Sequence, residues 1–306
     1  MERRRFGATG LDVSVLGFGG APIGVLETDQ SEVDGVLGLL LDHGVNLIDT
    51  AAGYRGSEEA IGRAVGSRRD EFVLVSKCGQ AFEDLPGDAW SEAVILATVD
   101  RSLKRLQTDY IDVMLLHTCD QEVLETGEAL GALARARDAG KIRFAGYSGD
   151  NQAGAYAACL SDVAVVQTSL NICDQVNIDE VLPLAADNDV GVMAKRPIAN
   201  AAWKDLNEQP GFYARYAETY TERLALMAIG PEDLGFEEAD WAELALRFTL
   251  SHDVHTAIIG TTNPDHVLAN LQAASKGPLP TGVLDQLRAA FAEAVADAGE
   301  PWEGQT

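Results

Sequence analysis

Residues 44–65 read GVNLIDTAAGYRGSEEAIGRAV and lay out a strand, a turn and a helix in close succession. The apolar run 45–49 predicts a short buried strand that ends in the carboxylate of Asp49. Small residues follow as a turn, and apolar side chains then recur with helical spacing as far as Val65. Ser57, at the start of this helix, is expected to be its N-cap. A strand followed directly by an amphipathic helix is the building unit of α/β folds.

Units of this kind recur along the chain. Short runs rich in Val, Ile and Leu, typical of strands buried on both faces, occur at residues 16–20, 45–49, 72–77, 110–117, 142–148, 163–167, 190–195 and 254–260. Segments with helical spacing lie between them, among them 31–43 and 123–139. Eight units in 306 residues predict a single (β/α)8 TIM barrel domain spanning residues 1–306. An open doubly wound sheet is the alternative, but Gly17–Gly20 lacks the GxGxxG spacing of a dinucleotide fingerprint.

Three segments fall outside this repeat. The runs on either side of Ala8–Gly10, RRRFG and LDVSVLGFG, predict an N-terminal β-hairpin. Residues 197–237 form a long segment after the seventh strand, with some helix of its own, and loops of that length are more often functional than idle. Residues 281–298 predict a helix added after the eighth unit.

Composition narrows the classes of partner. A net charge of −25 argues against nucleic acid and anionic membranes, because both require a positive protein surface. Neither a membrane-spanning stretch nor a signal peptide is evident, so the cytoplasm is the expected location. The excess of acid also fits a high-salt cytoplasm, with an acidic enzyme at ordinary salt as the alternative. Four cysteines without a CxxC pair predict free thiols rather than disulfides or a metal cluster.

Polar residues stand at the ends of successive predicted strands. They are Asp49, Lys77, His117, Ser148, Gln167 and Lys195. Taken singly, each has an ordinary structural explanation, such as a turn, a surface lysine or a core histidine. In a barrel, however, the carboxyl ends of the strands meet at one face, where active sites lie. Their joint placement therefore indicates a functional site.

The residue types suit the reduction of a carbonyl group. When hydride is added to a carbonyl carbon, the oxygen needs a proton, and Tyr54 can donate one although its ordinary pKa is about 10. The ammonium of Lys77 would stabilise the tyrosinate, and Asp49 would hold that ammonium in place. His117 can point a ring nitrogen at the carbonyl oxygen. A divalent metal site would need more acidic or histidine ligands than these strand ends supply, so no metal is predicted.

Several stretches resemble the aldo-keto reductases. They are GVNLIDTAAGYRGSEEAIGRAV (44–65), VLVSKCG (73–79), SLKRLQTDYIDVMLLH (102–117), KIRFAGYSG (141–149), VVQTSLN (165–171) and AIIGTTNPDHVLANL (257–271). The resemblance implies a (β/α)8 barrel that uses NADPH or NADH to reduce aldehydes and ketones, with some members oxidising sugars. It also implies that Tyr54 is the general acid, Lys77 the residue that tunes it, Asp49 the partner of the lysine, and His117 the residue that orients the carbonyl.

The cofactor contacts implied by the resemblance are less complete. Ser148 and Gln167 match the residues that hold the nicotinamide carboxamide. Gly149 stands where the family often has Asn, and Asp150 or Asn151 could substitute. Lys195 stands where many members stack an aromatic ring on the nicotinamide.

The eighth unit bears on the choice between NADP and NAD. Asn263 and Pro264 are typical of a helix start. Many NADP-specific members place a lysine and an arginine around this turn to bind the 2′-phosphate; here those positions are Gly260 and His266. Thr261 and Asn270 do fit the pattern. The resemblance thus implies relaxed cofactor choice, with NADP(H) preferred and NAD(H) accepted, and Arg196 or Arg247 could replace the missing cation.

Three functions remain open from the sequence. The first is a reductase acting on a small aldehyde or ketone. The second is a dehydrogenase of the same fold that oxidises sugars or secondary alcohols. The third is a cofactor-sensing regulatory protein, against which the intact set of four catalytic residues counts.

Overall fold

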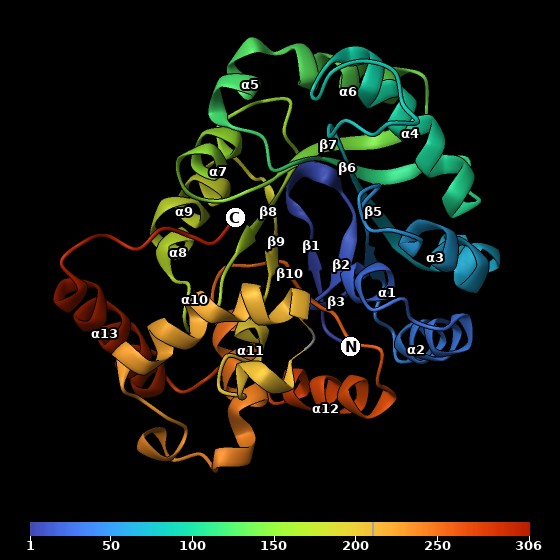
Figure 1. Ribbon diagram of the computed structural model, residues 1–306. Coiled ribbons are helices and arrows are strands. Elements are labelled where there is room, and N and C mark those ends of the chain that lie inside the picture. Colours follow the sequence, from blue (N-terminus) through green and yellow to red (C-terminus); the bar gives the residue numbers. More distant parts are fainter. Residues whose placement is uncertain (210) are drawn as a thin grey trace.

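The barrel predicted from the strand pattern is confirmed. The structure, a computed structural model, describes residues 1–209 and 211–306, without the side chains of 208 and 211–213, so part of the predicted segment 197–237 lies outside the described residues. Within these residues, parallel strands close into an eight-stranded barrel (Figure 1). In barrel order they are β3 (Leu16–Gly19), β4 (Leu47–Asp49), β5 (Val73–Cys78), β6 (Ile111–His117), β7 (Ile142–Ser148), β8 (Val165–Ser169), β9 (Gly191–Lys195) and β10 (Thr256–Ile259), which returns to pair with β3.

Helices follow every strand and cover the outside of the barrel. They are α1 (Ala21–Val25), α2 (Gln30–Asp42), α3 (Ser57–Val65), α4 (Glu92–Leu106), α5 (Gln121–Thr126), α6 (Glu128–Asp138), α7 (Asn151–Ala158), α8 (Val176–Glu180), α9 (Leu182–Asp187), α10 (Gly211–Met227), α11 (Trp241–Leu250), α12 (Pro264–Ser275) and α13 (Thr281–Ala298). The helix predicted inside segment 197–237 is α10, and the added C-terminal helix is α13. Among the described helices, none combines the length and apolar character that a membrane crossing requires.

The inside of the barrel follows the two-residue period of its strands. One cluster of inward side chains consists of Phe6, Val13, Leu47, Val73, Val75, Val113, Leu115, Val165, Met193 and Ile258. Outward neighbours such as Ile48 and Met114 pack instead in the larger core beneath the helices. In some strands the next inward residue after the last apolar one is polar. Its side chain points into the opening at the carboxyl ends of the strands, which we call the mouth of the barrel. In this way Leu47 leads to Asp49, and Leu115 leads to His117.

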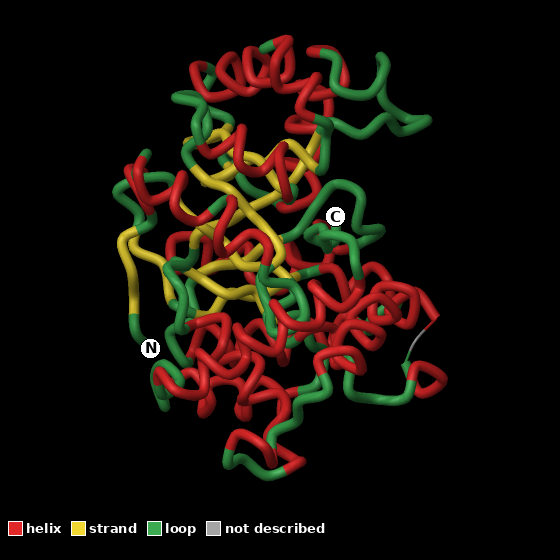
Figure 2. Tube along the Cα trace, turned by 90° about the vertical axis from the view of Figure 1, so that its left-hand side faces the viewer, coloured by secondary structure: helices red, strands yellow, loops and turns green. Residues whose placement is uncertain are grey.

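The N-terminal hairpin closes the other end of the barrel. Strands β1 (Arg3–Arg5) and β2 (Asp12–Ser14) pair antiparallel, with Arg3 opposite Ser14, as predicted. Phe6, just after β1, is fully buried against the start of β9, where a Cβ on Gly191 would lie 2.7 Å from the Phe6 ring. Figure 2 shows the hairpin and the C-terminal segment at opposite sides of the molecule. The hairpin therefore closes the barrel at the amino ends of the strands, opposite the polar side chains at their carboxyl ends.

Two local predictions are wrong. Ser57 does not cap α3; the N-cap is Gly56, with φ of 73°, because the Ser57 side chain is fully buried. Its hydroxyl instead donates to the Gly20 carbonyl (2.9 Å) and hydrogen-bonds the Thr50 hydroxyl (2.8 Å), tying two strand ends together. The single helix predicted at 123–139 is two helices, since Gly127 takes a left-handed φ of 69° between α5 and α6.

Candidate active site

Three of the four predicted catalytic side chains meet at the ends of neighbouring strands. The Lys77 ammonium lies 2.7 Å from each carboxylate oxygen of Asp49 and donates to the Thr50 carbonyl at 2.9 Å. Both side chains of this pair are almost completely buried. His117 comes from the next strand, β6, and completes the inward layer. The strand register places the Asp49–Lys77 ion pair at the bottom of the mouth, which is referred to below as the floor of the site.

Tyr54 reaches the same place from the turn after β4. Backbone bonds from Thr50 and Ala52 to β5 carbonyls continue the pairing beyond the strand, and Tyr54 N–H then donates to the Ala51 carbonyl at 2.9 Å. The turn brings the Tyr54 ring centroid to 5.1 Å from Lys77 Nζ. The ring meets His117 edge-on, with 5.8 Å between centroids. The four residues thus form one cluster, although their positions along the chain are far apart.

Burial and charge set the protonation states in this cluster. Burial raises the pKa of Tyr54 above its ordinary value, with the charge of Lys77 acting against that rise, so the phenol keeps its proton at neutral pH. Burial, Lys77 and Lys195 all lower the pKa of His117, which makes a neutral imidazole. Burial alone would lower the pKa of Lys77, but Asp49 and Tyr54 raise it, so the ammonium stays charged. The site holds a proton donor, a neutral ring and a fixed cation.

The two residues predicted to hold a carboxamide are linked to this cluster. Gln167 donates from Nε2 to Asp49 Oδ1 at 2.9 Å, and the Ser148 hydroxyl donates to Gln167 Oε1 at 3.0 Å. Both side chains are buried in the mouth. An amide and a hydroxyl side by side offer donors and acceptors that complement another amide. These residues therefore fit a nicotinamide carboxamide.

The departure at Gly149 has a structural cause. A Cβ at this position would lie 2.3 Å from the Tyr147 hydroxyl, which donates to the Cys119 carbonyl at 2.6 Å. The carboxylate of Asp150, suggested as a substitute for the Asn side chain that the family often has at position 149, has partners elsewhere. Its Oδ1 accepts from the Thr168 hydroxyl and the Ser169 N–H, while Oδ2 pairs with Lys195.

The residues predicted around the 2′-phosphate lie at the start of α12. Asn263 caps this helix as predicted, accepting from the Asp265 N–H at 2.9 Å. Thr261 and Asn270 are buried, and His266 is exposed with its ring 3.4 Å from the Thr261 hydroxyl.

Neither of the two positions discussed at this turn, Gly260 and His266, carries a lysine or an arginine. A Cβ on Gly260 would lie 2.9 Å from the Pro22 ring, so a longer side chain there requires Pro22 to move. Arg247 is committed elsewhere, to the carbonyls of Gly277 and Pro278 and to Glu243. It is therefore unsuited to the role suggested from the sequence.

The last residues of the chain also reach the mouth. In Figure 1 the chain beyond α13 returns to the barrel and ends near β8. Asn151 exchanges two hydrogen bonds with the backbone of Gly304, and the Ser169 hydroxyl donates to the Gln305 carbonyl at 2.8 Å. Gly304 fits because a Cβ there would lie 2.6 Å from Asn177 Nδ2. Residues 302–306, which we call segment 302–306, are too few to show a periodicity from which these contacts could be predicted.

Comparisons with known proteins agree with the geometry. A model of the Aldo/keto reductase family matches residues 15–292. YqkF of Bacillus subtilis, described as an uncharacterized oxidoreductase, is 30% identical over 295 residues, covering 90% of this chain and 92% of the relative. L-galactose dehydrogenase of Arabidopsis thaliana is 27% identical over 293 residues, covering 90% and 89%. The solved holo structure of aldo-keto reductase AKR11C1 from Bacillus halodurans matches with a TM-score of 0.79 at 28% identity, covering 95% of this chain and 96% of that one. The chain therefore belongs to the aldo/keto reductase family.

Proposed function

We propose that this protein is an NAD(P)(H)-dependent oxidoreductase that reduces aldehydes or ketones to alcohols. Members of its family are generally oxidoreductases that use nicotinamide cofactors. The observation that carries the proposal is the buried Asp49–Lys77 pair beneath the Tyr54 ring, with His117 at its edge. A purely structural ion pair would not require a tyrosine and a neutral histidine at its open side.

The proton transfer follows from these residues. A nicotinamide cofactor, when bound, supplies the hydride that reaches the carbonyl carbon. Tyr54 gives its hydroxyl proton to the carbonyl oxygen, acting as general acid. Lys77 stabilises the tyrosinate that remains, and Asp49 keeps the ammonium in position. His117, as a neutral imidazole, can donate an N–H to the carbonyl oxygen and so orient it.

The residues that would hold the cofactor come from the strands β7 and β8, from the turn after β10 and from α12. Ser148 and Gln167 would bind the carboxamide, for which their hydroxyl and amide groups are suited. The start of α12, with Thr261, His266 and Asn270, would take the far phosphate through free backbone N–H groups. Because Gly260 carries no side chain there, we propose that NADP(H) is preferred but NAD(H) is accepted.

A sugar dehydrogenase of the same fold is the second candidate. A pocket of about 300 Å³ beyond the ends of β6 and β7 is lined by polar side chains such as Thr118, Asp120, Gln121 and Gln152 and also by Cys119, Tyr147 and Ala153; the four catalytic residues lie outside this lining. Such groups bind hydroxyls, and one relative is named L-galactose dehydrogenase. The catalytic residues would be the same, with Tyr54 accepting the proton in the reverse direction.

A substrate panel tests the proposal. Aldehydes and ketones are supplied with NADPH or NADH, sugars and secondary alcohols with the oxidised cofactors, and turnover is followed at the nicotinamide absorbance. Reduction of at least one carbonyl class is expected. Turnover confined to sugars favours the second candidate. Cofactor binding without any turnover contradicts both and favours a cofactor-sensing protein.

A further inference from the structure

Two consecutive basic residues end β9 at the mouth of the barrel. Lys195 follows the inward period, and its ammonium lies 2.8 Å from Asp150 Oδ2. Arg196 has a positive φ of 58°, and Ala199, Asn200 and Ala201 also have positive φ. Such values are uncommon for residues other than glycine and are retained where the surroundings enforce them, often at functional sites. The backbone after β9 is therefore held in a conformation that fixes where Arg196 emerges.

The guanidinium of Arg196 has neutral partners. Its Nη1 donates to the Ser169 hydroxyl at 2.7 Å and to the Gln305 carbonyl, and its Cζ lies 5.1 Å from the centre of the Tyr216 ring. Within the described residues, no carboxylate forms an ion pair with it. Arg196 is partly exposed.

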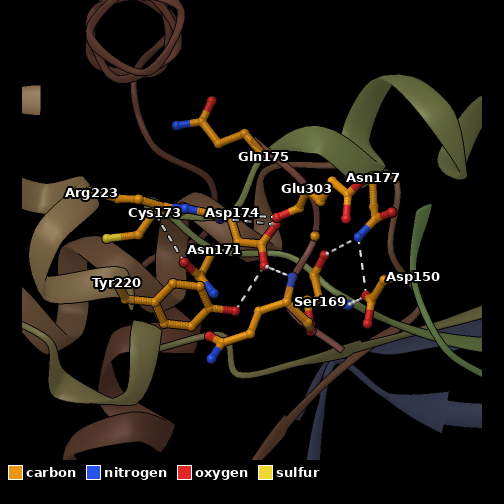
Figure 3. Close-up of polar contacts among 12 residues, drawn as sticks. Asp150, Ser169, Asn171, Cys173, Asp174, Gln175, Asn177, Tyr220, Arg223 and Glu303 are labelled. Atoms are coloured by element: carbon orange, nitrogen blue, oxygen red, sulfur yellow. Dashed lines mark hydrogen bonds and ion pairs between the residues drawn. The ribbon is translucent and has the colours of Figure 1, made fainter. Parts of the chain in front are cut away.

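Nearby carboxylates are already committed to other cations. Asp150 pairs with Lys195 at 2.8 Å, and Asp174 faces Arg223 at 3.9 Å. Figure 3 shows Asp174 between Tyr220 and Arg223; it accepts from the Tyr220 hydroxyl and the Gln305 N–H. In this cluster three cations, Lys195, Arg196 and Arg223, lie near two carboxylates, those of Asp150 and Asp174. One positive charge is left over, in a chain whose net charge is −25.

Arg196 is connected to the reacting groups through β8. It donates to Ser169, and Gln167, two residues earlier on the same strand, donates to Asp49 at 2.9 Å. We infer that Arg196 is an oxyanion receptor, which binds a carboxylate or phosphate group of a molecule that enters the mouth of the barrel beside Tyr54. A guanidinium suits this role because its planar fork matches both groups. The inference rests on the proposed function, and the oxyanion comes either from the carbonyl substrate or from a phosphate of the cofactor.

Matched substrate pairs distinguish these sources. The first pair is 4-oxobutanoate and butanal, and the second is glyceraldehyde 3-phosphate and glyceraldehyde. kcat/KM is measured for the wild type, Arg196→Gln and Arg196→Lys. Arg137→Gln is the control, since Arg137 lies on α6 and pairs with Asp138 at the surface. The Kd of NADPH is measured separately by quenching of tryptophan fluorescence.

With a substrate oxyanion, the wild type prefers the charged member of a pair by about tenfold or more, as a charge-assisted hydrogen bond allows. Arg196→Gln loses that preference, Arg196→Lys keeps part of it, and Arg137→Gln keeps all of it. With a cofactor phosphate, Arg196→Gln instead raises the Kd of NADPH by about tenfold at unchanged preference. If neither the preference nor the Kd changes, Arg196 only anchors segment 302–306, and the inference is overturned.

A readout that needs no turnover separates this inference from the proposed function. The melting temperature is recorded with and without succinate or inorganic phosphate. Stabilisation of the wild type but not of Arg196→Gln supports the receptor even if no substrate turns over. Equal shifts for both proteins, together with unchanged NADPH affinity, contradict it even if the enzyme is an active reductase.

Discussion

Replacing Lys77 by methionine tests how the floor of the site is held together. The Lys77 and Asp49 side chains are 1% and 2% exposed, and the ammonium contacts both carboxylate oxygens at 2.7 Å. Without the ammonium, Asp49 remains buried with Gln167 as its side-chain donor. Removing one member of a buried ion pair costs about 3–5 kcal/mol, because the other charge is left uncompensated.

A double substitution isolates the origin of that cost. Asp49→Asn with Lys77→Met removes both charges and keeps an acceptor for Gln167, so the double variant should lose at least about 2 kcal/mol less than the sum of the single losses. Free energies of unfolding are measured by urea titration at pH 7 with circular dichroism. Lys276→Met is the control, since its pair with Glu243 lies at the surface and should contribute about 1 kcal/mol or less. The reasoning is refuted if Lys77→Met costs no more than Lys276→Met, or if the single losses add.

Three further predictions concern other parts of the molecule. Burial raises the pKa of Asp174 to about 6, above its ordinary 3.8, so the folded protein binds this proton more tightly than the unfolded chain. Its contribution to stability therefore falls by about 2 kcal/mol as pH rises from 4 to 6, and urea titrations across that range should show a flatter dependence for Asp174→Asn. Ser57→Ala leaves the Gly20 carbonyl without this donor and should cost about 1–3 kcal/mol of unfolding free energy by the same assay, whereas a cost near zero contradicts the tie between strand ends. Side-by-side kcat/KM values should favour NADPH over NADH by less than about a thousandfold, and a larger ratio would reveal a basic contact to the 2′-phosphate not identified here.

The fold and the site floor were predictable because they follow a short-range period. Apolar inward positions such as Leu47 and Leu115 alternate with outward ones, and the first polar residue in that series is the one that faces the mouth. The sequence could not predict Gly149, because its cause is the ring of Tyr147 packed against it in space. The docking of segment 302–306 likewise depends on contacts between residues more than a hundred positions apart.

The hydroxyl of Ser57 shows a similar limit. Local rules favour a serine at the start of a helix as an N-cap, but tertiary packing buried this one and gave its hydroxyl to two other strand ends. The sequence suggests Arg196 as a contact for the 2′-phosphate but gives no indication of the hydrogen bonds that it donates to Ser169 and Gln305 in the structure. A sequence shows which residues are charged, but the fold determines which groups they pair with.

The central claim is that Tyr54 gives a proton to a carbonyl oxygen, and Tyr54→Phe tests it most directly. The best carbonyl substrate of the panel is assayed with wild type, Tyr54→Phe and Tyr156→Phe, a control on α7. Because a positioned general acid contributes about 10²–10⁴ in rate, kcat/KM of Tyr54→Phe should fall by at least a hundredfold, while the control and the Kd of NADPH change little. Full retention of carbonyl reduction by Tyr54→Phe would contradict the account.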